Sequence, residues 1–317
     1  IKLQTIDEKN RYMKILITGV AGFIGSNLAR SLLKKNYTVI GIDNLSYGVK
    51  EQIPSGVKFH NADIRDLNIS ELFKDVDYVF HLAAKNCITD CQENPLETFD
   101  INVNGTINIF DAALMNNVKK VIYAESSSVY EGSKILPSKE SDIAPQSIYA
   151  ISKITTNLIA KDYSKSKGLV TTGLRYFNVY GPRQDYRRSV PPVFSAFIIS
   201  LLKNNPPTIF GDGSKKRDFI YVDDVNRFHL MCIENENTNN EIFNIGSGES
   251  HSIKFIFENI ANILSSDIKP IFGKNFDFEA QENLANIDKA KKIGWSPKVT
   301  LQHGLKKSID YIKEHVI

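Results

Sequence analysis

A tyrosine and a lysine, Tyr149 and Lys153, stand four residues apart in the segment PQSIYAISK. If this segment begins a helix, both side chains lie on one face, about one turn apart. A phenol with an ordinary pKa of about 10 is a poor base at neutral pH, but an adjacent ammonium group stabilises the phenolate. General-base catalysis needs a group whose pKa is near the working pH. The pair therefore predicts a site of proton transfer, provided that the surrounding elements support it.

A glycine-rich segment, TGVAGFIGS at residues 18–26, indicates a dinucleotide site. Its glycines stand at positions 19, 22 and 25, between a predicted strand and a predicted helix. The first permits a tight turn, the second lets a pyrophosphate approach the backbone, and the third lets helix and strand pack closely. The phosphates then lie at a helix N-terminus, where free N–H groups and the helix dipole favour negative charge. This context favours a dinucleotide site over the alternative, in which the glycines serve only the packing of helix on strand.

Two acidic residues follow the next predicted strands. Asp43 ends the segment TVIGID, about twenty residues after the glycines, and its carboxylate can accept hydrogen bonds from both ribose hydroxyls of an adenosine. It would repel a 2′-phosphate, and no arginine follows at once, so the sequence favours NAD over NADP. Asp63, in NADIRD, could contact the adenine or cap a helix, and the sequence leaves both roles open.

The surrounding sequence alternates short apolar segments with longer amphipathic ones. Predicted strands cover 14–19, 38–43, 57–64, 77–84, 120–127 and 170–181, and predicted helices cover 26–35, 95–116 and 153–167. This order indicates an α/β fold, a Rossmann-type doubly wound parallel sheet with helices on both faces. Beyond residue 175 the rhythm loosens, and 209–224 is expected to form a loop and a strand. We expect an NAD-binding Rossmann domain at 13–175 and a smaller, substrate-binding α/β part at 176–317, with the chain crossing between the two.

Composition argues against several classes of protein. The formal net charge of +3 over 317 residues is small and the charges are mixed, which does not indicate a nucleic acid or a membrane surface as partner. No apolar run approaches the ~20 residues that span a bilayer, and residues 1–12 lack the apolar centre of a signal peptide. We expect these residues to be an extension before a natural start at Met13, or a remnant of expression. The cysteines, three in number and without a histidine cluster, indicate a cytoplasmic protein with no metal site.

Together these motifs resemble those of the extended short-chain dehydrogenases/reductases, and more closely those of the UDP-glucose and UDP-N-acetylglucosamine 4-epimerase family. The resemblance covers essentially everything from Met13 to the C-terminus. Further matching segments are HLAA (81–84), NVNGT (102–106), RYFNVYGPRQ (175–184), GDGSKKRDFIYVDD (211–224), NIGSG (244–248) and GWSPKVTLQHGL (294–305). The resemblance implies that Tyr149 removes a proton from a sugar hydroxyl while hydride passes from C4 to NAD. It also implies that Lys153 lowers the pKa of Tyr149 and anchors the ribose, and that Ser126 bridges the proton.

The reaction that follows this oxidation depends on residues 126–128, which read Ser-Ser-Ser. The resemblance implies that 4,6-dehydratases carry Thr-Asp-Glu at these positions and that decarboxylating members keep a glutamate at the third. Glu125 precedes the run, but strand alternation should turn it away from Ser126. A serine is not an effective base at C5, which leaves rotation of the keto sugar and return of the hydride, that is, epimerisation at C4. The alternatives are a reductase or dehydratase-like enzyme acting on another nucleotide sugar, or a dinucleotide-binding regulator without catalysis.

The resemblance also implies which residues bind the two ligands. For NAD we expect contacts from Gly19, Gly22, Phe23, Ile24, Gly25, Asp43, Asn44, Asp63, Ile64, Leu82, Ala83, Ala84, Tyr149, Lys153 and Tyr176. For the nucleotide sugar we expect contacts from Ser127, Asn178, Arg217, Glu279 and Asn283. Asn178 and Arg217 match ligands of the diphosphate, for which a planar guanidinium is well suited. Asn283 falls where the family leaves room for the C2 substituent, and its size would admit an N-acetyl group.

One segment departs from the family pattern. Family members carry Arg-x-Gly-Asp/Glu upstream of NIDKAKKIGW, whereas this chain reads FDFE, with Phe276 in place of the arginine. Only Glu279 remains of the pair that clasps phosphate and ribose. Lys274, or Arg187 and Arg188, could compensate for the missing charge.

The resemblance further implies a homodimer, in which segments 95–116 and 148–166 of two chains form a four-helix bundle. Ile151, Ile154, Leu158 and Ile159 supply apolar positions for such a bundle. Packing within one chain would give the same pattern, so the residues themselves leave both arrangements open.

Overall fold

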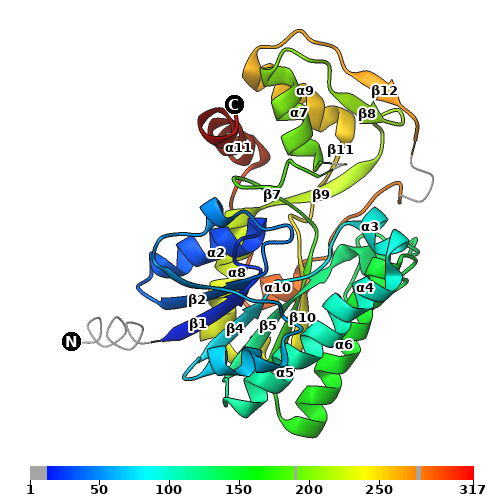
Figure 1. Cartoon of the computed structure of the whole chain (residues 1–317). Coiled ribbons are helices and arrows are strands. Elements are labelled where there is room, and N and C mark those ends of the chain that lie inside the picture. The colour runs from blue at the N-terminus through cyan, green and yellow to red at the C-terminus, as the bar shows by residue number, and fades with distance from the viewer. Residues whose placement is uncertain (1–12, 189–190, 276–279) are drawn as a thin grey trace. The chain divides into compact units, whose positions relative to one another are not determined.

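The computed structural model of the chain describes residues 13–188, 191–275 and 280–317. Its main sheet has seven strands in the order β10–β6–β5–β4–β1–β2–β3 (Figure 1). The strands are β1 (Lys14–Thr18), β2 (Thr38–Asp43), β3 (Val57–Asn61), β4 (Tyr78–His81), β5 (Lys120–Ser126), β6 (Thr171–Tyr176) and β10 (Glu241–Ile245). β1 pairs in parallel with β2 and β4, β2 with β3, and β4 with β5. This order, which reverses next to β1, confirms the predicted Rossmann-type α/β fold.

Helices cover both faces of this sheet, with α2 and α8 on one side and α5 and α6 on the other (Figure 1). They are α2 (Phe23–Leu33), α3 (Ile88–Glu93), α4 (Pro95–Phe99), α5 (Gly105–Met115), α6 (Ile148–Lys167) and α8 (Val222–Glu234), with short 3-10 segments at Lys50–Gln52, Leu67–Phe73, Ser127–Tyr130 and Glu236–Thr238. The helix predicted at 95–116 is divided, because a π-helical turn at Asp100–Asn104 joins α4 to α5. α6 begins earlier than residue 153, because the Ser147 side chain caps it by accepting a hydrogen bond from the Ala150 N–H.

The core around the sheet fixes the edge where the predicted site residues stand. Leu16 in β1 and Val79 in β4 are fully buried, as expected for parallel strands that are covered on both faces. Ile109 and Phe110 of α5 belong to the same core cluster. The Phe110 ring also contacts the ring of Tyr123 in β5 edge-to-face, with 5.9 Å between the ring centres. The carboxyl ends of β1, β2, β4 and β5 are therefore held in fixed register beside one another.

The chain divides into two compact units, each built from several segments. The first contains the residues up to Tyr130, Ile143–Arg175 and Asn226–Phe243, and the second contains Glu131–Asp142, Tyr176–Val225 and Asn244–Ile317. One crossing falls between Arg175 and Tyr176, the residue that ends β6 and is a predicted cofactor contact. The functions assigned to 13–175 and 176–317 stay predictions.

The described residues of the second unit form two small sheets and four helices. β7 (Asn178–Tyr180), β9 (Lys216–Tyr221) and β11 (Ser250–Ser252) form one sheet, and β8 (Thr208–Phe210) and β12 (Ile271–Gly273) form the other. The helices are α7 (Val193–Leu202), α9 (Ile253–Leu264), α10 (Asp288–Lys292) and α11 (Leu301–His315). Aromatic rings form much of the core, where Tyr180 stacks on Phe194 at 4.3 Å and Phe194 meets Phe219 at 4.8 Å. Among the residues that the structure describes, no helix is both long and apolar enough to cross a bilayer.

Candidate active site

The loop between β1 and α2 brings the glycines of the predicted dinucleotide site into a tight turn that packs closely on its surroundings. Gly19 has a φ of +74°, and a Cβ atom there would lie 2.8 Å from the Ala83 nitrogen. A Cβ atom at Gly25 would lie 2.1 Å from the Gly19 carbonyl oxygen, so only glycine lets α2 pack this closely on the loop. Gly22 is the N-cap residue of α2 and has no side chain to cap it. The first turn, which includes residues 23–25 of the predicted cofactor site, is therefore open to an anion.

Asp43 lies at the end of β2, beside this glycine loop. Its Oδ2 accepts a hydrogen bond from the Ala21 N–H at 2.9 Å, and its Oδ1 accepts one from the Leu45 N–H at 2.9 Å. Burial raises the pKa of Asp43, whereas these two backbone hydrogen bonds lower it. A carboxylate accepts up to about four hydrogen bonds, so acceptor capacity remains for ribose hydroxyls. The contact with the ribose itself stays a prediction.

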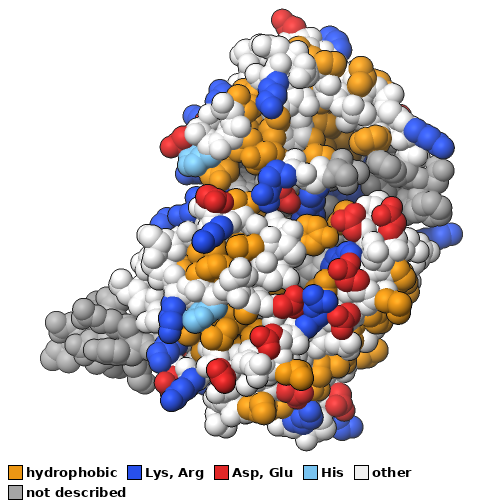
Figure 2. All heavy atoms as spheres, in the orientation of Figure 1, with side chains coloured by type: hydrophobic (Ala, Val, Ile, Leu, Met, Phe, Trp, Pro, Cys, Tyr) orange, Lys and Arg blue, Asp and Glu red, His pale blue; other side chains and the backbone are white. Residues whose placement is uncertain are grey.

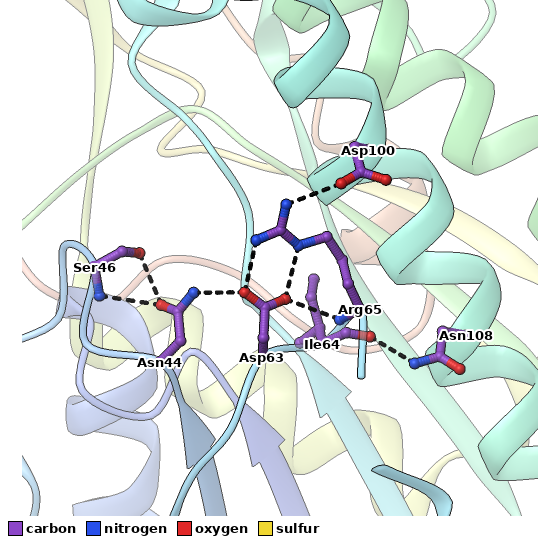
Figure 3. Close-up of polar contacts among 7 residues, drawn as sticks. All are labelled: Asn44, Ser46, Asp63, Ile64, Arg65, Asp100 and Asn108. Carbon is purple, nitrogen blue, oxygen red and sulfur yellow. Dashed lines mark hydrogen bonds and ion pairs between the residues drawn. The ribbon is translucent and has the colours of Figure 1, made fainter. Parts of the chain in front are cut away.

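Asp63 lies in a cluster of charged and polar groups that follows β3 (Figure 3). Its carboxylate accepts hydrogen bonds from the Asn44 amide at 2.9 Å, from the Arg65 N–H at 2.9 Å, and from Nε and Nη2 of Arg65 at 2.9 and 2.8 Å. Arg65 also donates from Nη1 to Asp100 at 2.8 Å, which connects this loop to the π-helical turn. The Arg65 guanidinium holds the pKa of Asp63 well below its usual range. The residue that caps the following 3-10 segment is Asp66, not Asp63.

Four hydrogen bonds fill the acceptor capacity of Asp63. In this arrangement its carboxylate fixes Asn44 and the backbone around Ile64, and a direct contact with adenine stays a prediction. The Ile64 carbonyl also accepts a hydrogen bond from the Asn108 amide at 2.8 Å (Figure 3). Arg65 was not predicted as a site residue, although its position two residues after Asp63 indicates a possible ion pair.

Replacing Arg65 with glutamine should raise the dissociation constant for NAD about fivefold, because Asp63 and Asn44 lose the group that orients them. The expected effect is modest, since partly exposed ion pairs contribute little. Calorimetric titration of the protein with NAD, after removal of any bound cofactor, measures it. Lys14→Gln is the matched control, because it removes the exposed ion pair between Lys14 and Asp75. Equal NAD affinity in Arg65→Gln and the wild type would contradict a positioning role for Arg65.

His81, the first residue of the HLAA segment, is buried at the end of β4, and burial lowers its pKa to about 3. Its Nδ1 lies 2.7 Å from the Thr18 hydroxyl and its Nε2 lies 3.0 Å from the Thr106 hydroxyl. Because Thr106 donates its own proton to the Asn102 carbonyl, Nε2 must carry the hydrogen and Nδ1 must accept one from Thr18. The Thr18 oxygen also accepts from the N–H groups of residues 82 and 83. Neutral His81 thus fixes the backbone that is predicted to contact NAD.

The first turns of α6 carry the predicted catalytic pair. Tyr149 is 9% exposed and Lys153 is 5% exposed. Lys153 Nζ donates a hydrogen bond to the Ala124 carbonyl of β5 at 3.0 Å and lies 5.9 Å from the centre of the Tyr149 ring. Burial lowers the pKa of Lys153 to about 8. The turn is held by Ser152, whose hydroxyl donates to the Tyr149 carbonyl at 2.7 Å and accepts from Asn102 at 3.0 Å.

The serine run ends β5 and begins the 3-10 segment Ser127–Tyr130. The Ser126 hydroxyl oxygen accepts a hydrogen bond from the Ser128 N–H at 3.2 Å. The Ser128 hydroxyl is buried and has no hydrogen-bond partner within the described ranges. Glu125 is buried in an ion pair with Arg175 at 2.7 Å, so its carboxylate is engaged in the core. Hydroxyl groups therefore stand where, by family resemblance, elimination or decarboxylation would need carboxylates.

Three predicted substrate residues lie on and beside the three-stranded sheet of the second unit. Asn178 in β7 donates from Nδ2 to the Asp218 carbonyl at 2.9 Å and to Asn283 Oδ1 at 3.2 Å. Arg217 in β9 donates from Nη1 to the Ala280 carbonyl at 2.9 Å. The structure thus joins Asn178 and Asn283 directly, and it places Arg217 in the strand next to β7. Their contacts with a substrate stay predictions.

The Asp218 carboxylate was not predicted, although it organises this region. It is fully buried and accepts hydrogen bonds from the Ser247 N–H at 2.6 Å, the Ser247 hydroxyl at 2.7 Å, the Gly248 N–H at 3.0 Å and the Ala285 N–H at 3.1 Å. Burial raises its pKa, and the hydrogen bonds oppose this effect. Asp218 therefore joins the NIGSG segment to the strand that carries Arg217.

The departure from the family pattern at residue 276 concerns a part of the chain that is not described. Phe276 and Glu279 both lie outside the described residues. Of the suggested substitutes for the missing arginine, Arg187 and Arg188 both contact Asp185, at 3.2 and 3.4 Å. Their role in phosphate binding stays a prediction.

Comparison with known proteins gives similarity over most of the chain. A model of the NAD dependent epimerase/dehydratase family matches residues 15–246. A protein of Methanocaldococcus jannaschii, named a putative UDP-glucose 4-epimerase, is 40% identical over 305 residues, or 95% of this chain and 99% of that protein. The UDP-glucose 4-epimerase of Thermotoga maritima, solved with UDP-glucose, is 34% identical with a TM-score of 0.92, covering 96% of this chain and 100% of that one. The UDP-N-acetylglucosamine 4-epimerase of Methanobrevibacter ruminantium, solved with UDP-N-acetylmuramic acid, is 33% identical with a TM-score of 0.92 and the same coverage.

Proposed function

The chain belongs to the NAD-dependent epimerase/dehydratase family, and from this premise we propose that it interconverts the C4 epimers of a UDP-activated hexose. It is an enzyme that uses NAD, as the sequence predicts. The relatives described above, which match 95–96% of the chain, are named as UDP-sugar 4-epimerases, one of them as a putative one. The observation that carries the proposal is the buried Tyr149–Lys153 pair of α6, which Lys153 connects to β5 through the Ala124 carbonyl, two residues before a serine run without carboxylates at positions 127 and 128.

The residues of the first unit fit NAD. The uncapped start of α2 can receive the pyrophosphate, and the Asp43 carboxylate has free acceptor capacity beside the glycine loop. The backbone at residues 82 and 83 is held by Thr18, which His81 in turn contacts. When bound, NAD would supply the acceptor and the donor of the C4 hydride.

Tyr149 acts first as a base and then as an acid. Its phenolate removes the proton from the sugar O4, and the Lys153 ammonium group stabilises that phenolate. The Ser126 hydroxyl relays the proton between O4 and Tyr149. After the 4-keto sugar has rotated, Tyr149 returns a proton to O4 on the opposite configuration at C4. No carboxylate at 127 or 128 is present to drive elimination instead.

The second unit holds the nucleotide sugar in this proposal. Asn178 and Arg217 bind the diphosphate, the former through its amide and the latter through its planar guanidinium. Glu279 binds the uridine ribose, and Ser127 contacts the sugar. Asn283 leaves room for either a C2 hydroxyl or an N-acetyl group, so both UDP-glucose and UDP-N-acetylglucosamine are candidate substrates.

A panel of UDP-glucose, UDP-galactose and their N-acetyl forms tests the proposal, with products separated by chromatography and identified by NMR. We expect interconversion of C4 epimers without net formation of NADH. A net change in NADH would instead indicate a reductase, and a 4-keto product that absorbs in base would indicate a dehydratase. Absence of turnover on the whole panel, with NAD still bound, would support a regulatory protein.

We also propose a cytoplasmic location. Cys87, Cys91 and Cys232 are all free thiols in the structure. Unpaired cysteines are typical of a reducing compartment. Blotting of fractionated cells tests this location directly.

We further propose that the enzyme is a homodimer through α4, α5 and α6. Leu158 is 60% exposed and Ile151 is 37% exposed on α6, and Ile154 is partly buried between them. Ile159, in contrast, packs against the core of its own unit. Figure 2 shows hydrophobic side chains among charged ones over α4 and α6. Exposed apolar side chains on paired helices would be buried by a second copy of the chain.

Leu158→Asp should convert the dimer into a monomer, because each copy would bring an unpaired carboxylate to the apolar centre of the bundle. Light scattering after gel filtration measures the mass at several protein concentrations. Ile271→Asp is the matched control, since Ile271 is 54% exposed on β12 of the other unit. The proposal would be wrong if the wild type were monomeric, or if Leu158→Asp stayed dimeric at all concentrations.

A further inference from the structure

A buried ion pair joins β5 to β6 near the catalytic pair. The Glu125 and Arg175 side chains are 0% and 1% exposed, and Arg175 Nε lies 2.7 Å from Glu125 Oε2. Arg175 also donates from Nη1 to the Tyr130 hydroxyl at 2.8 Å, and its guanidinium carbon lies 5.4 Å from the centre of that ring. Burying two charges costs desolvation energy that their attraction often fails to recover. Stability alone therefore does not explain why this core contains an ion pair.

The pair lies next to the hydrogen bond that anchors the catalytic lysine. Lys153 Nζ donates to the carbonyl of Ala124, the residue immediately before Glu125. Burial lowers the pKa of Lys153, and the charge of Glu125 acts in the opposite direction. A protonated Lys153 is what the proposed chemistry requires, because only the ammonium form stabilises the Tyr149 phenolate.

Two other titratable groups that act on or face Lys153, Cys91 and His81, carry no charge at neutral pH. Cys91 on α3 has a thiol pKa that burial raises. His81 on β4 has a pKa of about 3, lowered first by burial and then by the charge of Lys153 itself. Tyr149 lies on the same helix, with its ring centre 5.9 Å from Nζ. Of the groups that act on Lys153 within the described residues, Glu125 is thus the carboxylate that offsets its burial.

The second oxygen of the Glu125 carboxylate, Oε1, does not contact Arg175. Within the described ranges, Oε1 is buried and makes no hydrogen bond of ordinary geometry, although the Tyr123 phenol interacts with this carboxylate. It lies against Gly173, where an added Cβ atom would be 3.0 Å from Oε1 and 2.7 Å from the Tyr123 hydroxyl. The Tyr123 phenol accepts a hydrogen bond from the Asn157 amide at 3.1 Å, and burial, together with the charge of Glu125, raises its pKa well above the usual value. The charge of Glu125 therefore also affects a group outside the ion pair, the Tyr123 phenol.

We propose that Glu125 is a positioning residue for catalysis, which keeps Lys153 protonated and thereby keeps Tyr149 reactive, while Arg175 and Tyr130 hold the carboxylate in place. The inference rests on the proposed function, because Glu125 acts only through Lys153 and Tyr149. In this proposal the glutamate before the serine run acts through its charge and takes no part in an elimination reaction.

Glu125→Gln tests the proposal, because it keeps the side-chain shape and an acceptor for Arg175 while it removes the charge. The alkaline limb of the pH profile of kcat/KM should move to lower pH by about one unit, since Lys153 then loses its proton more readily. A second readout does not need turnover: the tyrosinate absorbance of the NAD-bound enzyme, taken as a difference from the corresponding Tyr149→Phe protein. The pKa of Tyr149 should rise in Glu125→Gln. If the pH profile of kcat/KM and the tyrosinate titration of Glu125→Gln both coincided with those of the wild type, the proposal would be overturned.

The double variant Glu125→Gln/Arg175→Gln covers the case in which the single variant fails to fold, because it leaves no unpaired ion in the core. Its alkaline limb should also lie below that of the wild type. Lower thermal stability with an unchanged pH profile would show that the pair is only structural, and would overturn the proposal. If the wild type epimerised no UDP-hexose, the proposed function would fail, whereas the tyrosinate titration would still decide the role of Glu125.

Discussion

Replacing Tyr149 with phenylalanine is expected to reduce kcat for epimerisation about 10³-fold while NAD stays bound. In the proposed mechanism the phenol takes the O4 proton and later returns it, and general acid–base catalysis of this kind contributes about 10²- to 10⁴-fold. Phenylalanine preserves the ring, which is 9% exposed in the first turns of α6, so the fold should be unchanged. Turnover of the UDP-hexose that the panel identifies, together with the NAD content of the purified protein, measures both parts of the prediction.

Tyr163→Phe provides the matched control on the same helix. Its hydroxyl donates a hydrogen bond to Asp111 at 3.0 Å, and the proposed mechanism gives it no role. We expect activity within about twofold of the wild type, since loss of one partly exposed hydrogen bond has little effect away from the reacting atoms. If Tyr149→Phe retained more than a tenth of the wild-type activity, or if both variants lost activity equally, Tyr149 would not be the base.

The sequence predicts elements well where a short-range pattern determines the structure. β1 and β2 form where apolar runs are bounded by a glycine-rich turn and an acidic residue, and their observed bounds are Lys14–Thr18 and Thr38–Asp43. The glycine spacing depends on steric requirements that are local to one turn, which explains why its geometry could be anticipated. The start of α6 was predictable in principle, because Ser147 stands where a helix cap is preferred.

Polar contacts between distant residues could not be predicted in this way. Arg65 meets Asp100, and His81 lies between Thr18 and Thr106, only because the sheet brings β1, β3, β4 and the turn before α5 together. Glu125 carries no local signal that its partner is Arg175, fifty residues later. The sequence likewise carries no local signal that β10 lies beside β6 in the main sheet, because residues 176–225 of the second unit come between these strands in the chain.

Gly25→Ala is expected to abolish NAD binding and to lower the free energy of unfolding by about 3 kcal/mol, in the upper range for overpacking. The added Cβ atom would lie 2.1 Å from the Gly19 carbonyl oxygen, 2.9 Å from the Gly19 carbonyl carbon and 3.0 Å from the Val20 Cα. All three are backbone atoms, so no side chain can move to relieve the clash. α2 must instead shift away from the loop, and its first N–H groups then leave the position that the pyrophosphate requires. Denaturant unfolding and calorimetric titration with NAD measure the two effects.

Gly168→Ala separates this steric effect from the general effect of adding a methyl group to a glycine. Gly168 ends α6 with a φ of +74°, and nothing lies within 4 Å of the Cβ atom that would be added. Its expected loss is about 1 kcal/mol, from the left-handed backbone alone, with NAD affinity unchanged. Gly25 has the opposite combination, since its backbone is not left-handed but its surroundings leave no room. Similar losses of NAD affinity in the two variants would show that general destabilisation, and not the packing of α2 on the loop, controls cofactor binding.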